Sequence, residues 1–111
     1  MNKTITHENV TLIEEKDMVC KIINEKGSFE PETTHWWKNM IQRAIQENST
    51  VIDVGAYAGY YTIMAAKAGV NCWSFEPNES VYKRLIENLN INSCSHIPIV
   101  KKMGCSNEIS K

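Results

Sequence analysis

The sequence predicts an α/β fold built on a small parallel sheet, and three observations support this prediction. From residue 50 onward, short β-branched or apolar runs alternate with segments of helical periodicity, and glycines separate them. With 111 residues, the chain is about as long as one small domain. Its composition, 42% hydrophobic and 23% charged, is that of a globular protein rather than of a disordered, collagen-like or coiled-coil chain.

The first 49 residues are expected to form a lead-in of one short strand and two helices. The apolar run 10–13 predicts the strand, and Asp17 can cap a first helix that ends at Gly27. A longer helix is expected from residue 33 or 34 to about 48, and the tryptophan pair that includes Trp36 is assigned to packing. Its predicted apolar stripe consists of Trp37, Met40, Ile41, Ala44 and Ile45.

Residues 50–111 are expected to form the parallel sheet, with strands at 50–54, 71–75 and about 97–100. A helix at about 60–68 connects the first two strands, and a second helix capped by Asn78 connects the next two. The first helix has its predicted apolar face at Tyr61, Met64, Ala65 and Ala68, and the second at Val81 or Tyr82, Leu85, Ile86 and Leu89. This βαβαβ order is half of a Rossmann-like doubly wound parallel sheet.

The position of each strand in that sheet has two consequences. Pro98 cannot donate to a strand ladder, and the third strand lies at the edge in the 3-2-1-4-5 order, where proline is tolerated. The first strand is expected to be central, yet the chain offers no second neighbour for it. Its apolar edge is therefore a predicted site of self-association.

Chemistry is expected at the turn that follows the first strand. Gly55 and Gly59 stand between a strand and a helix, where glycine lets a ligand approach backbone amides at the helix N-terminus. Glu76 follows Gly55 by 21 residues, at the end of the neighbouring strand, where a carboxylate can accept both hydroxyls of a ribose. Together these features predict a bound adenosine.

The residues between the glycines favour an adenosine ligand without phosphate. A dinucleotide site needs a glycine where Tyr57 stands, and Asp53 would repel a diphosphate but attract an ammonium group. No Gly-Lys-Ser/Thr sequence is present, which excludes a Walker loop. S-adenosylmethionine, with its sulfonium and amino groups, fits this pattern, and a dinucleotide-dependent oxidoreductase is disfavoured.

Two stretches of the chain resemble a known enzyme family. Residues 51–62, VIDVGAYAGYYT, look like motif I of class I S-adenosylmethionine-dependent methyltransferases and more narrowly like the FkbM family. Residues 75–78, FEPN, followed by Leu85, Asn88 and Asn92, are similar to the same family's second conserved stretch. The segment 17–30 is similar to its lead-in before motif I, so the likeness covers roughly residues 17–106.

The resemblance implies cofactor-binding residues and a reaction. The methionine part of S-adenosylmethionine would lie along the backbone of Gly55, Ala56, Tyr57 and Gly59, which would pass under it. Asp53 would lie near the amino group of the cofactor. Glu76 would bind the ribose, and Pro77 would border the adenine. From the residues alone, Asp53 could instead cap the turn, and Glu30 could either close over the cofactor or be a solvent-exposed glutamate. The implied reaction is O-methylation of a hydroxyl on a small molecule or glycan, with no catalytic residue assigned.

The chain differs from the family in its extent, because it stops soon after the third predicted strand. We therefore expect a cofactor-binding half of a methyltransferase domain whose activity alone is doubtful. The alternative is a catalytically silent adenosine-ligand binding module, or a fragment completed by another chain.

Charge and cysteine content restrict the partners and the location. Twelve basic residues oppose thirteen acidic ones, and this net charge of −1 favours neither nucleic acid nor an anionic membrane. No apolar run is long enough to span a membrane, and the first residues lack the apolar core of a secretion signal. The four cysteines and three histidines show no metal-ligand spacing. We expect a cytoplasmic protein with reduced thiols and no metal site.

Overall fold

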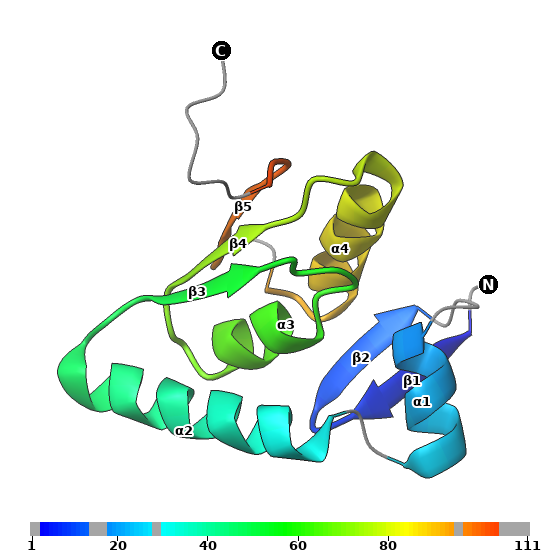
Figure 1. Cartoon of the computed structure of the whole chain (residues 1–111). Helices are drawn as coiled ribbons and strands as arrows, with labels where there is room; N and C mark the ends of the chain where they lie inside the picture. The colour runs from blue at the N-terminus through cyan, green and yellow to red at the C-terminus, as the bar shows by residue number, and fades with distance from the viewer. Residues whose placement is uncertain (1–2, 14–17, 28–29, 95–96, 105–111) are drawn as a thin grey trace.

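A computed structural model describes residues 3–13, 18–27, 30–94 and 97–104 (Figure 1). The described elements, in chain order, are β1 (Thr4–His7), β2 (Val10–Ile13), α1 (Met18–Lys26), α2 (Pro31–Glu47), β3 (Val51–Val54), α3 (Tyr60–Lys67), β4 (Cys72–Phe75), α4 (Glu79–Ile91) and β5 (Ile99–Lys101). The expected mixture of helices and a parallel sheet is therefore confirmed.

β1 and β2 form an antiparallel hairpin that the sequence predicted only in part. The strand at 10–13 is confirmed, and its partner pairs from Thr4 opposite Ile13 to His7 opposite Val10. Glu8 and Asn9 form the two-residue turn with φ of 54° and 64°, the left-handed geometry that suits the twist of a hairpin. Val10 and Leu12 bury their side chains against α3 and α4, so the hairpin is part of the core.

The second sheet has the strand order β3-β4-β5, with all neighbours parallel. The third strand thus lies at an edge as expected, although it begins at Ile99 rather than at residue 97. Pro98 immediately precedes it, which agrees with the inability of proline to donate to the ladder. Among the described residues, no strand pairs with the other edge of β3.

The two faces of this sheet are in different environments. On one face, Val51 and Asp53 of β3 and Cys72 and Ser74 of β4 are buried, and α3 packs there. The opposite face presents apolar side chains that remain well exposed: Ile52 (59%), Val54 (61%), Trp73 (42%) and Ile99 (43%). Strand register aligns three of them in one row, Ile52 beside Trp73 beside Ile99.

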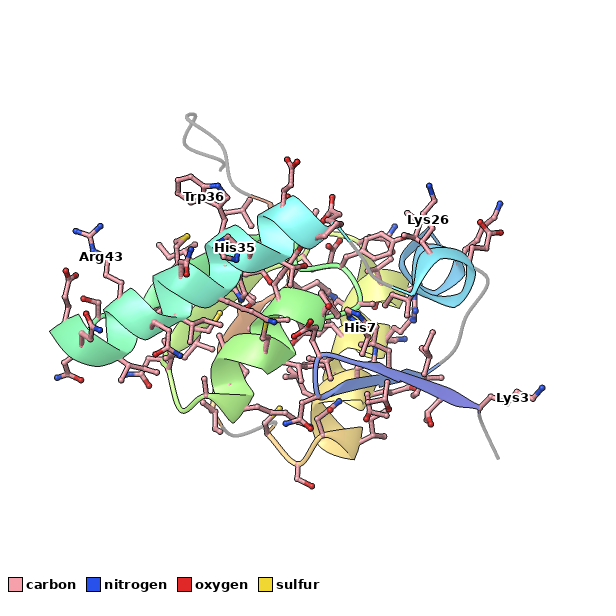
Figure 2. The ribbon with its side chains drawn as sticks, turned by 90° about the horizontal axis from the view of Figure 1, so that it is seen from below. Lys3, His7, Lys26, His35, Trp36 and Arg43 are labelled. Atoms are coloured by element: carbon pink, nitrogen blue, oxygen red, sulfur yellow. The ribbon has the colours of Figure 1, made fainter. Side chains whose placement is uncertain are left out.

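α2 corrects the expected apolar stripe. Its buried residues are Thr34, Trp37, Ile41 and Ala44, while Met40 and Ile45 are exposed. The buried stripe is narrow, and the main contacts of the helix among the described elements are with α3 and β3. Packing is confirmed for Trp37, whose indole N–H donates to the carbonyl of Tyr61 at 2.8 Å. It is wrong for Trp36, which is 71% exposed and points away from the other elements in Figure 2.

α3 also differs from its expected pattern. Residues 60 and 62–66 are all buried, so the helix has no single apolar face, whereas Tyr61 is half-buried and Ala68 is exposed beyond its end. The cause is its central position, since α3 contacts α2, the hairpin, β3 and β4 (Figure 1).

The remaining helix ends agree with the sequence. Gly27 has a φ of 73° and its N–H donates to the carbonyl of Ile23 at 2.8 Å, which ends α1 as predicted. The predicted cap at Asp17 lies outside the described residues. Asn78 caps α4, where Leu85 and Leu89 are buried and Ile86 is partly buried as expected.

One apolar core joins residues on both sides of position 50. It contains Leu12, Trp37 and Ile41 together with Ile63 and Leu85. The division of the chain at residue 50 stays a prediction. Among the described cysteines, Cys72 and Cys94 are free and buried, as expected for reduced thiols. None of the described helices combines the length and the apolar character needed to cross a membrane.

Candidate functional site

The candidate site lies at the carboxyl ends of β3 and β4, where the two predicted stretches meet. The glycine loop, defined here as residues 55–59, follows β3, and Glu76 follows β4. The N–H groups of Gly55 and Ala56 both donate to the carbonyl of Phe75, at 2.8 and 3.0 Å. The glycine loop is therefore fastened directly to the end of the neighbouring strand.

Glu76 joins the two strand ends through its side chain. Its Oε1 accepts the N–H of Tyr57 at 3.0 Å, and its Oε2 accepts the N–H of Asn78 at 3.1 Å. The residue is only 6% exposed, so it is no solvated surface charge. Because each carboxylate oxygen can accept more than one hydrogen bond, Glu76 keeps acceptor capacity for hydroxyl donors. Sequence spacing indicated that Glu76 belongs to the site but not that it shapes the loop.

Tyr57 occupies a backbone conformation that residues with side chains rarely adopt. Its φ is 53°, in the left-handed region, which costs a non-glycine residue roughly 1–2 kcal/mol. The hydrogen bond from its N–H to Glu76 holds this conformation. Strained residues of this kind concentrate at ligand sites, where the surroundings fix the backbone.

The two glycines of the loop have different roles. Both have positive φ, 70° at Gly55 and 98° at Gly59. A side chain added at Gly55 would meet nothing within 4 Å, which leaves room for a ligand beside the backbone. A Cβ at Gly59 would lie 2.5 Å from Leu85 Cδ1, so this glycine is needed for the packing of the loop against α4. Sequence reasoning had assigned both glycines to a ligand and had missed this contact.

Asp53 faces the interior rather than the tip of the loop. It is 8% exposed, and its Oδ2 accepts the hydroxyl of Thr62 at 2.6 Å. The same hydroxyl lies 2.7 Å from that of Ser74. Burial raises the pKa of Asp53, hydrogen bonds from the Thr62 side chain and backbone lower it, and the charge of Glu76 raises it further. Asp53 thus binds Thr62 in the first turn of α3, while its capping of the turn after β3 and its role toward a ligand both stay predictions.

The electrostatics of the site favour a cation over a phosphate. Asp53 and Glu76 are close enough for their charges to interact, and within the described part of the chain neither is in an ion pair. The N–H groups of Gly55, Ala56, Tyr57 and Gly59 all donate to protein acceptors. Since a phosphate site needs such groups free to donate, these four N–H groups do not favour a diphosphate.

The structure also describes the other residues that the sequence singled out. Pro77 is exposed at the end of β4. Glu30 is exposed at the start of α2, and its Oε1 accepts the hydroxyl of Tyr61 at 3.0 Å. Burial is the main cause that raises the pKa of both Tyr60 and Tyr61 to about 12, so both stay protonated at neutral pH. No group of acidic, histidine and cysteine side chains suited to a metal occurs among the residues that the structure describes.

Comparisons with known proteins support the fold. No family model matches the chain. The uncharacterized protein MJ1452 of Methanocaldococcus jannaschii is 29% identical over 65 residues, which cover 59% of this chain and 25% of that protein. A SAM-dependent methyltransferase from Agrobacterium tumefaciens superposes with a TM-score of 0.66 and 13% identity, over 91% of this chain and 32% of that one.

A second solved structure extends this comparison. The O-methyltransferase TomG from Streptomyces achromogenes, in complex with SAM, superposes with a TM-score of 0.52 and 16% identity, over 78% of this chain and 43% of that one. The chain thus spans about a quarter of the length of the relative it matches and less than half of either solved structure. These likenesses confirm an incomplete Rossmann-like α/β fold of the kind found in methyltransferases.

Proposed function

We propose that this chain forms the cofactor-binding half of an S-adenosylmethionine-dependent methyltransferase of FkbM type. The observation that carries the proposal is the pair of buried carboxylates, Asp53 and Glu76, beside a glycine loop in which four of the five N–H groups donate to protein acceptors. Such a site attracts a cation and accepts hydroxyl donors, and it repels a diphosphate. S-adenosylmethionine is an adenosine ligand with cationic groups and no phosphate.

Each residue of the site has a defined part in this proposal. Glu76 accepts the two ribose hydroxyls with the lone pairs that its backbone donors leave unused. The negative charge of Asp53 attracts the amino group, directly or through water. The open space beside Gly55 admits the methionine part along the backbone of Ala56 and Tyr57. Exposed Pro77 borders the adenine.

The proposed reaction is methylation of a hydroxyl on a small molecule or glycan. When bound, S-adenosylmethionine supplies a methyl group already activated by its sulfonium. The chain therefore has mainly to bind and orient the reactants and to exclude water. The FkbM likeness and the O-methyltransferase among the structural neighbours support a hydroxyl acceptor. A cytoplasmic location belongs to the same proposal and is supported by the free thiols of Cys72 and Cys94.

Calorimetric titration of the purified chain tests the ligand class. We expect S-adenosylmethionine and S-adenosylhomocysteine to bind and NAD to show no binding, because only NAD carries a diphosphate. If NAD bound and S-adenosylmethionine did not, the methyltransferase proposal would be lost.

Glu76→Gln tests the ribose contact with little change of shape. Glutamine keeps one oxygen for the N–H of Tyr57 but loses the charge and half of the acceptor capacity. We expect affinity for S-adenosylmethionine to fall at least tenfold, about 1.4 kcal/mol. Glu47→Gln at the exposed end of α2 is the matched control, with unchanged affinity expected. Unchanged affinity in a folded Glu76→Gln variant would remove Glu76 from the ribose site.

A further inference from the structure

The hairpin reaches the glycine loop through one buried side chain of α4. Asn88 is 0% exposed, and its Oδ1 accepts the N–H of Ile13 in β2 at 2.8 Å. Its Nδ2 donates to the carbonyl of Ala58 in the glycine loop, also at 2.8 Å. Both ends of a single amide are therefore used, one on the hairpin and one on the loop.

A second asparagine, at the C-cap of α4, binds the hairpin and its own helix, and no hydrogen bond to the loop is among its described contacts. Asn92 Oδ1 accepts the N–H of Thr11 at 2.9 Å, and its Nδ2 donates to the carbonyl of Thr11 at 2.5 Å and to that of Asn88 at 2.7 Å. Residues four apart on a helix rise about 6 Å, close to the roughly 7 Å between alternate strand residues. The two asparagines therefore form successive hydrogen bonds along the edge of β2. Of the two, Asn88 also forms a described hydrogen bond to the glycine loop.

The other end of the hairpin reaches the residue that follows the loop. His7 Nδ1 lies 2.7 Å from the hydroxyl of Tyr60, the first residue of α3, and the two rings are stacked with centroids 6.1 Å apart. Tyr60 is buried in the core, and the contact with His7 is partly buried. The hairpin is thus attached on both sides of Gly59, at Ala58 and at Tyr60.

We infer that the β1–β2 hairpin positions the glycine loop, with Asn88 and His7 as positioning residues that couple hairpin docking to the shape of the cofactor site. The consequence for ligand affinity rests on the proposed function, whereas the coupling between hairpin and loop does not. Coupling is reciprocal, so a ligand that fixes the loop also stabilises the docked hairpin.

Two matched variants separate this coupling from a general loss of packing. Asn88→Asp keeps an oxygen for Ile13 N–H but turns the donor toward Ala58 into an acceptor, which repels the carbonyl. Asn92→Asp makes the same chemical change at the asparagine whose described hydrogen bonds do not include the loop. Amide hydrogen exchange of the ligand-free chain is measured at Thr11, Ile13, Tyr57 and Gly59.

We expect Asn88→Asp to accelerate exchange at Tyr57 and Gly59 at least tenfold, and Asn92→Asp to accelerate it only at the hairpin. Unchanged loop exchange in Asn88→Asp would overturn the inference, as would equal loop acceleration in both variants. If Asn88→Asp does not fold, His7→Phe decides: it keeps the ring contact but lacks the nitrogen, and faster exchange at Gly59 is expected. Unchanged exchange there would overturn the inference.

Ligand binding gives an independent second measurement. We expect Asn88→Asp to weaken S-adenosylmethionine at least fivefold and Asn92→Asp to change its affinity less than twofold. In the wild-type chain, the ligand should slow exchange at Thr11 and Ile13, which it does not touch. If the wild type binds no S-adenosylmethionine, the proposed function fails, and the ligand-free exchange comparison still decides the coupling.

Discussion

The two faces of the β3-β4-β5 sheet differ in burial: one carries buried, hydrogen-bonded side chains and the other carries exposed apolar ones. On the face under α3, Asp53 of β3 and Ser74 of β4 both form short buried hydrogen bonds with the hydroxyl of Thr62 in that helix. On the other face, Ile52 and Trp73 stand side by side and largely exposed. Alternation along each strand produces both arrangements from the same four-residue segments.

This difference shows where stability and chemistry are concentrated. Parallel sheets are normally covered on both faces, so their strands are apolar throughout. Here the covered face holds the packing and the carboxylate next to the site, whereas the open face contributes apolar area that the described residues leave uncovered. Substitutions on the two faces should therefore differ in size and in kind.

The largest effect is expected at Gly59, which precedes α3 and packs against Leu85 of α4. Gly59→Ala places a Cβ 2.5 Å from Leu85 Cδ1 at a φ of 98°, so both strain and overpacking oppose it. We expect a loss of about 2–4 kcal/mol in the free energy of unfolding, measured by urea denaturation.

Gly69→Ala is the matched control, because Gly69 has a φ of 79° but open space around the added Cβ. It should lose only about 1 kcal/mol, from backbone strain alone. Equal losses in the two variants would show that the contact with Leu85 adds nothing.

A smaller effect of opposite sign is expected at Asp53. Because the pKa of Asp53 is raised in the folded state, the native chain binds more protons than the unfolded chain between the ordinary value of 3.8 and the raised one. The free energy of unfolding therefore falls as pH rises through that window, and the loss is complete above it. Asp53→Asn removes the buried charge while its amide oxygen still accepts from Thr62.

We expect Asp53→Asn to flatten this pH dependence and to gain up to about 1 kcal/mol at pH 7. The same variant should bind S-adenosylmethionine more weakly, because the attracting charge is gone. Thermal denaturation at pH 4 and pH 7 measures the first effect and calorimetry the second. A variant less stable than wild type at pH 7 would mean that the hydrogen bonds of the carboxylate outweigh its desolvation.

Sequence predicted the features that depend on neighbouring residues. β3 follows from a β-branched run, β4 from a short apolar run, and the helices after them from glycines and the cap at Asn78, all of which act within a few residues. β1 gave no signal, since its polar residues form a strand only against β2. Likewise, Glu76 could be placed at the site from its spacing.

The contacts between distant segments could not be predicted from the sequence. The bond from Glu76 to Tyr57 joins residues 19 apart, and that from Asn88 to Ile13 joins residues 75 apart. The sequence placed Asn88 and Asn92 in a stretch that resembles the family, but no local pattern shows that the edge of β2 lies alongside them. For the same reason, the steric need for Gly59 became visible only once α4 was placed against it.

The smallest effect on stability is expected on the open face. Threonine keeps the branched shape that suits strands, and Ile52 is already 59% exposed, so Ile52→Thr should change the free energy of unfolding by no more than about 0.5 kcal/mol. Val51→Thr is the matched change on the covered face of the same strand. There the hydroxyl would be buried in an apolar environment, at a cost of about 1–3 kcal/mol.

The open face should instead control association. Exposed apolar side chains favour contact between copies of the chain, and they lie beside the edge of β3, which no described strand pairs with and for which the sequence predicted self-association. We expect Ile52→Thr combined with Ile99→Thr to shift the chain toward monomer in sedimentation velocity, at concentrations where the wild type associates. Association unchanged by the double substitution would assign the self-contact to another surface. Equal losses in the free energy of unfolding for Val51→Thr and Ile52→Thr would remove the distinction between the two faces.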